Sequence, residues 1–419
     1  MGNIILRGGY LIDPSENICG ERDLLISDGH IEEVGFDIQA EKGDRVIDCS
    51  HYELWPGLVD MHLHVADLFE ISTNTVYCAA QDGVTTALSP GAGNTFMAPA
   101  LLGAETDRGL PINVGVYLGA LNVLGSQLDD EELIALFKGE LKDELKWEKL
   151  SHNRFTNSFA QYCIGLKEHM GHFLLTDEQI ERLYHITSES GLVFMSHTQD
   201  PEHSARLVEL SKGRQIHLGH TNAAGCGTHA EAEEGMKAVI GLCKHPNVTG
   251  EFVTTMLRRG LGNLEGLKMT KASRQRALDA LNEKIVDILV SDGQNQSTMK
   301  GFGDTRDNIP CILELVEEGV LDKSAAVAAM TSNPCRYLAE VTGCDEWKCK
   351  YGTLREGAYA NILIVDTENK RASYTITSGE PVSFEGRYIR GHGYAGNWVS
   401  RFGTSRTGVG DAPMYSTDN

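Results

Sequence analysis

Two histidines separated by a single residue, His62 and His64, follow a short apolar run at residues 58–61, which comes after a Pro-Gly turn. The run is typical of a buried strand, and residues two apart on a strand point to the same face. Both imidazoles therefore leave the strand side by side, where they can bind one metal ion such as zinc. Two histidines bonded to backbone at a sheet edge would give the same pattern, so the rest of the chain has to decide.

From residue 56 onward, apolar strand-like runs alternate with helix-like stretches. Strands are expected at residues 58–64, 84–89, 112–118, 161–167, 192–197, 215–220, 248–253 and 285–292. Helices are expected between them, for example at 177–189, 201–210 and 229–242, and a charged amphipathic helix with a solvated face is expected at 129–149. Eight strands alternating with helices favour a closed parallel α/β barrel over an open sheet.

Several of the expected strands end in residue types that bind metals. In such a barrel the chemistry lies at the carboxyl ends of the strands. These residues are His62 and His64 on the first strand, Lys167 on the fourth, His197 on the fifth, His220 on the sixth and Asp292 on the eighth. Each alone has an ordinary explanation as a structural histidine, a surface lysine or a helix cap. Together, at five strand ends, they predict a metal centre.

The sixth strand offers a second histidine, His217, three residues before His220. Alternation along the strand places the two side chains on opposite faces. We prefer His220 as the ligand because it lies at the end of the strand.

Short strands separated by turns lie on both sides of the barrel segment. Residues 3–50 contain runs broken by Gly-Gly, Asp-Pro-Ser-Glu-Asn and Ser-Asp-Gly, and β-character returns at 352–366 after a helix expected at 325–339. A sheet needs a partner layer. We therefore expect residues 1–55 and 345–400 to form one small β-sandwich, residues 56–344 to form the barrel, and residues 401–419 to form a polar tail.

This ordered set of residues resembles the amidohydrolase superfamily, in its binuclear branch of dihydroorotases, hydantoinases and isoaspartyl dipeptidases. Pro56-Gly-Leu-Val-Asp-Met-His-Leu-His matches the strand-one motif, and Gly352-Thr-Leu-Arg-Glu-Gly-Ala-Tyr-Ala-Asn is similar to the C-terminal signature, with Asn361 where Asp is usual. The resemblance covers residues 3–390 and implies a distorted (β/α)₈ barrel of the TIM type with a small β-sandwich made from both chain ends. Leu121 replaces the active-site tyrosine of the dipeptidase, and the residues after Lys167 lack an arginine that would bind a substrate carboxylate.

The resemblance also implies a cofactor set of two divalent ions, zinc or alternatively manganese, and a carbamate formed from carbon dioxide on Lys167. The modification is reasonable because an ammonium beside two dications would be repelled. His62, His64 and Asp292 would hold the more buried ion, and His197 and His220 the more exposed one.

The mechanism expected from this ligand set is amide hydrolysis. A water shared by the ions would give hydroxide near neutral pH, and Asp292 would act as general base and then as general acid toward the leaving nitrogen. The expected activity is hydrolysis of a carbon–nitrogen bond other than an ordinary peptide bond, in a cyclic amide or an N-acyl or amino-acid-derived amide.

Candidate substrate contacts lie after the sixth, seventh and eighth strands. They are Asn222, Arg258, Arg259 and the backbone of Gly293. Adjacent arginines can bind a carboxylate as a fork, although the same pair is also typical of an exposed helix start. His169 and His172 could shape the pocket or simply lie on the next loop.

Three alternatives remain open. The first is a deaminase of a nitrogen heterocycle with one metal ion, in which Lys167 would have no role. The second is an esterase or lactonase that uses the same metal site. The third is a catalytically silent homologue that serves as a scaffold, although such proteins typically lose ligands and here all six are present.

Composition limits the partners of the chain. A net charge of −22 over 419 residues argues against binding to nucleic acid or to an anionic membrane surface. No stretch approaches the roughly 20 apolar residues that span a bilayer, no signal peptide is evident, and the 10 cysteines form no C-x-x-C pair. The expectation is a cytoplasmic enzyme of a small-molecule substrate, and the resemblance implies a homo-oligomer, either a dimer or a tetramer.

Overall fold

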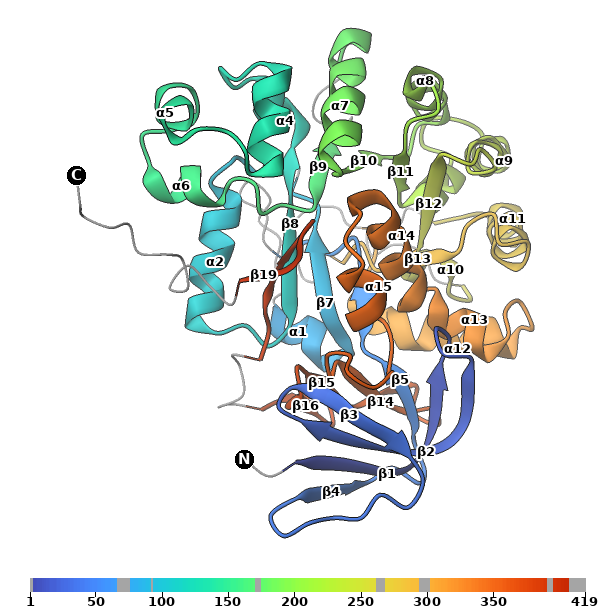
Figure 1. The fold of residues 1–419 in the computed structure, drawn as a ribbon. Helices are drawn as coiled ribbons and strands as arrows, with labels where there is room; N and C mark the ends of the chain where they lie inside the picture. The colour runs from blue at the N-terminus through green and yellow to red at the C-terminus, as the bar shows by residue number, and fades with distance from the viewer. Residues whose placement is uncertain are drawn as a thin grey trace, which may run out of the picture.

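Two sheets organise the chain, a barrel surrounded by helices and a separate sheet packed at one end of it (Figure 1). The computed structural model describes residues 3–65, 76–91, 93–169, 175–260, 268–293, 302–389 and 395–406. Within these ranges, no helix is both long and apolar enough to cross a membrane.

The barrel strands follow one another in chain order, and each pairs in parallel with the next. They are β6 (Leu58–Asp60), β7 (Val84–Ser89), β8 (Asn113–Gly119), β9 (Gly165–Glu168), β10 (Val193–His197), β11 (Ile216–Gly219), β12 (Val248–Val253) and β13 (Ile288–Val290). A parallel bridge between Leu63 and Gly293 joins the ends of the first and last strands. The predicted α/β barrel is confirmed, and each predicted strand overlaps one of these eight.

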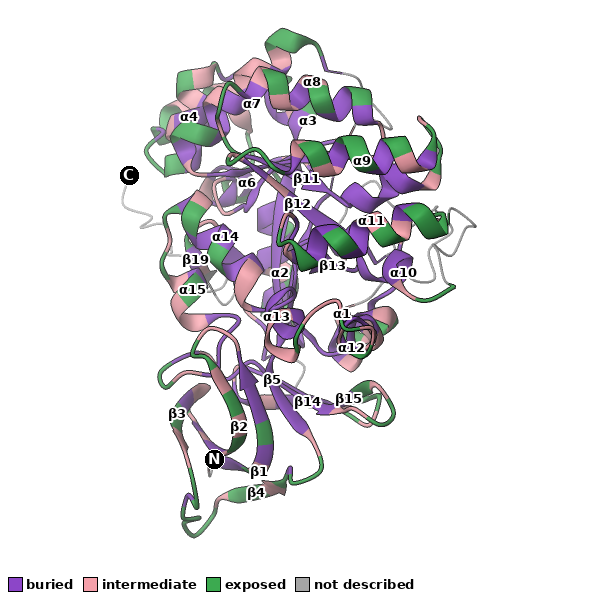
Figure 2. Cartoon of the chain, turned by 90° about the vertical axis from the view of Figure 1, so that its right-hand side faces the viewer, coloured by how far each residue is buried: buried purple, intermediate pink, exposed green. Residues whose placement is uncertain are grey.

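Helices cover the outside of the barrel because each buries one apolar face against it. In α7 (Asp177–Ser190) the buried face includes Ile180, Leu183 and Tyr184. Thr176 caps the start of this helix in a capping box, and Gly191 ends it in the left-handed conformation that glycine adopts most easily. The other longer helices are α2 (Ala98–Arg108), α8 (Pro201–Ser211), α9 (Ala232–Leu242), α11 (Lys271–Asn282), α12 (Asn308–Glu317) and α14 (Ser332–Thr342). Figure 2 shows the inward faces buried and the outer faces of α8, α9 and α11 exposed.

The prediction of one continuous helix at 129–149 is wrong, because the segment is divided. The segment forms α4 (Asp130–Lys138), α5 (Asp143–Leu145) and a π-helical turn at Lys146–Leu150. Gly139, with φ of 79°, ends α4 in a left-handed C-cap. The helix predicted at 325–339 is likewise divided, into α13 (Lys323–Ala328) and α14.

Both ends of the chain contribute to the second sheet, here called the terminal sheet. Its members are β1 (Ile4–Asp13), β2 (Ile18–Ser27), β3 (His30–Gly35), β4 (Arg45–Asp48), β5 (Glu53–Pro56), β14 (Ile362–Asp366), β15 (Arg371–Thr377), β16 (Glu380–Phe384) and β17 (Arg387–Tyr388). β5 joins the two parts, since it pairs with β1 on one side and with β14 on the other. The buried apolar core formed by this sheet includes Leu24, Leu54 and Ile364.

The last described strands belong beside the barrel. β18 (Trp398–Ser400) pairs with β8 and with β19 (Gly403–Arg406), and the buried ring of Trp398 packs on Phe159. The division of the chain at residues 55, 344 and 400 stays a prediction, and the structure adds that residues 398–406 lie along the barrel and not in the terminal sheet.

Candidate metal centre

The first and last barrel strands bring His62, His64 and Asp292 together. Asp292 Oδ1 lies 3.3 Å from His62 Nε2 and 3.1 Å from His64 Nε2, and all three residues are buried. Asp292 takes a left-handed backbone conformation, with φ of 46°. Such a conformation is costly for a residue other than glycine, and backbone strain of this kind is often retained at functional sites.

The fifth and sixth strands contribute a second pair of imidazoles. His220 Nε2 lies 2.9 Å from His197 Nδ1, and the ring of His220 lies 5.2 Å from that of His62 between centroids. His220 also has a left-handed backbone, with φ of 39°. His220 is buried whereas His197 is partly exposed, so the His197 side faces the opening of the site.

Lys167 lies in the same cluster. Its side chain is buried, and Gly219 on β11, two strands away, makes room for it. A Cβ atom at Gly219 would lie 3.2 Å from Lys167 Nζ and 3.2 Å from His62 Cε1. All six residues predicted as ligands are therefore brought to one place.

The donor atoms of this cluster suit a metal ion. Ligand atoms of His62, His220 and Asp292 all lie within 4.8 Å of one another. His220 Nδ1 and Asp292 Oδ2 are buried with no hydrogen-bond partner in the part of the chain that the structure describes. Burial and the neighbouring imidazoles hold the pKa of His197 and of His220 well below the usual value, which keeps the rings in the neutral form that binds metals.

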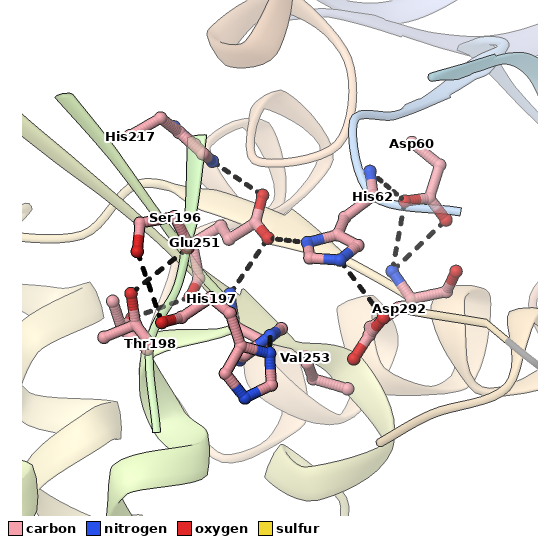
Figure 3. A network of polar contacts seen from close by, with 12 residues as sticks. Asp60, His62, Ser196, His197, Thr198, His217, Glu251, Val253 and Asp292 are labelled. Atoms are coloured by element: carbon pink, nitrogen blue, oxygen red, sulfur yellow. Dashed lines mark hydrogen bonds and ion pairs between the residues drawn. The ribbon is translucent and has the colours of Figure 1, made fainter. Parts of the chain in front are cut away.

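Sequence reasoning missed Glu251, which lies inside this cluster. Glu251, on β12, is buried and accepts hydrogen bonds from His62 Nδ1, from His217 Nε2 at 2.7 Å and from the backbone N–H of His220 at 2.9 Å (Figure 3). The signal was available, because a glutamate within the apolar run of the seventh strand needs partners for its charge. His217, the alternative to His220, bonds to Glu251 and faces away from the other imidazoles toward Tyr337.

The four predicted substrate contacts have other partners in the structure. The Asn222 amide bonds to both the N–H and the carbonyl of Val253, at 2.9 and 3.1 Å. The Gly293 N–H donates to Ser291 Oγ at 3.0 Å, and the Gly293 carbonyl accepts from the His64 N–H at 3.3 Å. These groups position the ends of β12 and β13.

Both arginines after β12 are paired with carboxylates near α12. Arg258 bonds to Asp307 at 2.5 Å and to Glu314 at 2.8 Å, and Arg259 bonds to Glu318 at 2.6 Å. The pair therefore does not form a free fork for a substrate carboxylate. His169 lies beside His197, with ring centroids 4.6 Å apart, whereas His172 lies outside the described residues.

A parallel barrel with imidazole, carboxylate and lysine groups gathered at its strand ends defines the class of metal-dependent barrel hydrolases. The model of the Amidohydrolase family matches residues 54–386, and the chain belongs to this family. It is a hydrolase that acts on carbon–nitrogen bonds outside ordinary peptides, as predicted, and the family implies divalent metal ions.

Curated relatives and solved structures agree with this placement. The chain is 25% identical over 402 residues to a dihydroorotase of Geobacter sp. (strain M21), across 87% of this chain and 89% of the relative. It is 26% identical over 396 residues to a dihydroorotase of Geobacter sulfurreducens, across 85% and 87%.

The fold is shared with an L-hydantoinase from Arthrobacter aurescens, with a TM-score of 0.70 and 16% identity over 96% of this chain and 100% of that one. It is also shared with a β-aspartyl dipeptidase from Fervidobacterium islandicum AW-1, with a TM-score of 0.64 and 14% identity over 93% and 98%.

Proposed function

We propose that this protein opens a cyclic amide by hydrolysis, using two divalent ions held by His62, His64, Lys167, His197, His220 and Asp292. The observation that carries the proposal is the convergence of ligand atoms of His62, His220 and Asp292, which come from three separate strands. Three such groups gathered in a buried place, with donor atoms left over, indicate a site that is completed by a cation.

The surroundings of Lys167 support its place in this set. Gly219 lets the amine lie against the ring of His62, within a cluster of imidazoles. An unmodified ammonium there would be repelled by the cations, because both are positively charged. A carbamate would be negatively charged and would provide the oxygen donors that the cations need. We therefore propose that Lys167 is carbamylated.

When bound, the ions supply Lewis-acid chemistry, since they acidify a water molecule and polarise the scissile carbonyl. Asp292 performs the proton transfers. Its Oδ1 faces His62 and His64, and its Oδ2 has no hydrogen-bond partner among the described residues, so Oδ2 can take a proton from the attacking water. The same proton then goes to the amide nitrogen as the carbon–nitrogen bond breaks, because an amide anion is a poor leaving group. Asp292 ends each cycle ionised.

The choice of a cyclic amide rests on the named relatives, which are dihydroorotases and hydantoinases. The β-aspartyl dipeptidase among the structural neighbours makes an open-chain amide the next substrate class to test. Zinc or manganese as the ions, a dimer or tetramer, and a cytoplasmic location are the accompanying proposals.

The test is a substrate panel with zinc- or manganese-loaded protein. The panel contains dihydropyrimidine and hydantoin rings, N-acyl amino acids, β-aspartyl dipeptides, simple lactones and amino-substituted purine and pyrimidine rings. Metal content is measured in the same samples. Ring opening with two ions per chain, lost in Asp292→Asn, supports the proposal. Release of ammonia alone, with one ion per chain, overturns it in favour of a deaminase.

The carbamate has its own measurement. Protein reconstituted with ¹³C-bicarbonate should show a carbamate carbonyl resonance, and that resonance should be missing in Lys167→Arg. A wild-type protein that is fully active without the resonance would show that Lys167 acts unmodified.

A further inference from the structure

We propose that Glu251 is a positioning residue that aligns the two halves of the metal centre through one carboxylate. The inference rests on the proposed function, because it concerns the ligands of the same ions. Figure 3 shows Glu251 between His217 on one side and His62 on the other, with His197 below.

Each oxygen of the Glu251 carboxylate is used by a different part of the site. Oε1 accepts from the ring of His62 and from the backbone N–H of His220 at 2.9 Å, and Oε2 accepts from the ring of His217 at 2.7 Å. One buried side chain on β12 thus connects the end of β6 with the end of β11. In the hydrogen bonds of the described residues, the carboxylate bonds to no atom that is proposed to bind an ion, so it acts through other residues.

The contact with His62 fixes which ring nitrogen can bind a metal. A carboxylate only accepts, so the proton of the His62 ring stays on Nδ1 and the lone pair stays on Nε2. Nε2 is the atom that lies 3.3 Å from Asp292 Oδ1. A carboxylate behind a ligating imidazole also makes the imidazole a stronger donor.

The contact of Glu251 with the backbone of His220 positions the other half of the metal centre, which consists of His197 and His220. His220 has φ of 39°, and a strained backbone of this kind persists only when its surroundings determine it. The hydrogen bond from its N–H to Glu251 supplies one such constraint, and Thr221 adds another, since its hydroxyl donates to the carbonyl of Glu251 at 2.7 Å. The ring of His220 is thereby kept beside His197 and His62.

His217 completes the arrangement. A buried carboxylate is costly unless it is fully hydrogen-bonded, and His217 provides the donor for Oε2. Although burial alone raises the pKa of Glu251, the two facing imidazoles hold that pKa well below its usual range. A histidine on the sixth strand that does not face the cluster thus has a role in supporting the carboxylate behind it.

Glu168, on β9 of the same barrel, offers a matched control. It is as buried as Glu251 and also bonds to a histidine and one further group, His203 at 3.1 Å and Ser196 at 2.7 Å. None of these partners belongs to the predicted ligand set. Glu168→Gln therefore reports the general cost of changing a buried, hydrogen-bonded carboxylate at this end of the barrel.

The experiment compares Glu251→Gln with Glu168→Gln in the full-length protein after metal removal. Zinc affinity is measured by competition with a chromophoric chelator, and the melting temperature of each metal-free protein is measured alongside. Glu251→Gln keeps one acceptor for His62 but loses the charge, so zinc affinity should fall by about 10- to 100-fold, whereas Glu168→Gln should stay close to wild type. With a substrate in hand, the loss should fall on kcat more than on KM.

Equal zinc affinity in wild type and Glu251→Gln overturns the inference, as do equal losses in both variants. Should Glu251→Gln fail to fold, His217→Leu tests the same carboxylate from the other side. It removes the donor to Oε2 and should also weaken zinc binding, and unchanged zinc affinity in His217→Leu would contradict the role.

Failure of the proposed function can be told apart from failure of this inference. A wild-type protein that binds zinc but opens no cyclic amide contradicts the proposed substrate, and the zinc comparison still tests Glu251. A wild-type protein that binds no zinc overturns both.

Discussion

Buried carboxylates in the terminal sheet differ from those at the mouth of the barrel in the partners that they have. Asp13, in β1, accepts from the Leu354 N–H at 2.6 Å, from Thr353 Oγ1 at 3.0 Å and from the N–H of Ser15 at 2.9 Å. Asp23 accepts from the backbone N–H groups of Gly8 and Ile38. These hydrogen-bond donors are neutral backbone and hydroxyl groups, although Arg7 Nε also lies 3.8 Å from Asp23 Oδ2. The bonds of Asp13 to Thr353 and Leu354 connect the two ends of the chain.

At the mouth of the barrel, the titratable groups face one another. Asp292 Oδ1 faces two imidazoles, while Asp292 Oδ2 and His220 Nδ1 are left over within the described residues. Among the described residues, buried polar atoms without a partner also occur in the terminal sheet, at the hydroxyls of Thr375 and Thr377. At the mouth of the barrel, however, they belong to a carboxylate and an imidazole that face other ligand-type side chains, which indicates that a ligand completes them. The comparison distinguishes carboxylates that hold the fold from carboxylates that serve chemistry.

Asp292→Asn should have the largest effect, and it tests whether Asp292 serves catalysis and not stability. The amide cannot accept the proton of the attacking water, so kcat should fall by about 100- to 10,000-fold, the usual contribution of general acid–base catalysis. The melting temperature of the metal-free protein should not fall, because Asp292 bonds to no backbone donor in the described structure. Steady-state kinetics and thermal unfolding measure the two effects, and a variant within tenfold of wild-type kcat would remove Asp292 from the reaction.

Asp82, a partly buried carboxylate between α1 (Val76–Gln81) and β7, has only a few partners of its own among the described residues. Its Oδ2 accepts from Thr305 Oγ1 at 2.5 Å. Burial raises the pKa of Asp82 from 3.8 to about 7, and the neighbouring carboxylates of Asp304 and Asp307 act in the same direction. The folded protein therefore binds more protons than the unfolded chain between those pH values, and stability should fall as pH rises from about 4 to about 7.

Asp82→Asn should remove the part of the pH-dependent fall in stability that comes from Asp82. The variant and the wild type should be equally stable near pH 4, whereas at pH 8 the variant should be more stable by up to about 4 kcal/mol, or three pH units at about 1.4 kcal/mol each. Asp60, whose pKa burial likewise raises to about 7, leaves a residual slope in both proteins. Urea unfolding at the two pH values is the measurement, and a constant difference between them would show that Asp82 does not titrate as described.

Asp13→Ala tests the other side of the comparison. It leaves the N–H of Leu354 and the hydroxyl of Thr353 without their acceptor, so the free energy of unfolding should drop by about 1–3 kcal/mol. The kcat of the folded fraction should stay at the wild-type value, because Asp13 belongs to the terminal sheet. A lowered kcat at full folding would show that the terminal sheet contributes to the site.

The sequence was sufficient for the strands, and for bringing the six proposed ligands to one place, because both follow from local pattern along each strand. The apolar run at 84–89 is the strand β7, and the sixth strand, predicted at 215–220, is β11 (Ile216–Gly219), which ends directly before His220. The long charged segment could not be divided correctly from periodicity alone, because its one break depends on the left-handed backbone at Gly139.

Residues whose roles depend on distant partners were not predicted. Glu251 is 189 residues from His62, and Arg258 is 49 and 56 residues from its two acids. Pattern along a strand predicts which face a side chain takes, but not which charged group faces it from another strand or helix. The predicted substrate role of the arginines depended on such partners, and so did the missed role of Glu251.

Arg259→Ala should have the smallest effect and tests the predicted substrate contact directly. Arg259 is half exposed, and its partner Glu318 also accepts from Arg274 at 2.8 Å. Because Glu318 keeps a cation after the substitution, the free energy of unfolding should drop by less than about 1 kcal/mol, as for surface ion pairs in general. KM for the substrate identified in the panel should not change, since the guanidinium is already bound to a carboxylate. A KM raised tenfold or more would mean that Arg259 leaves Glu318 to bind the substrate. The charged groups at the end of β12 would then belong with those that serve chemistry, and not with those that hold the fold.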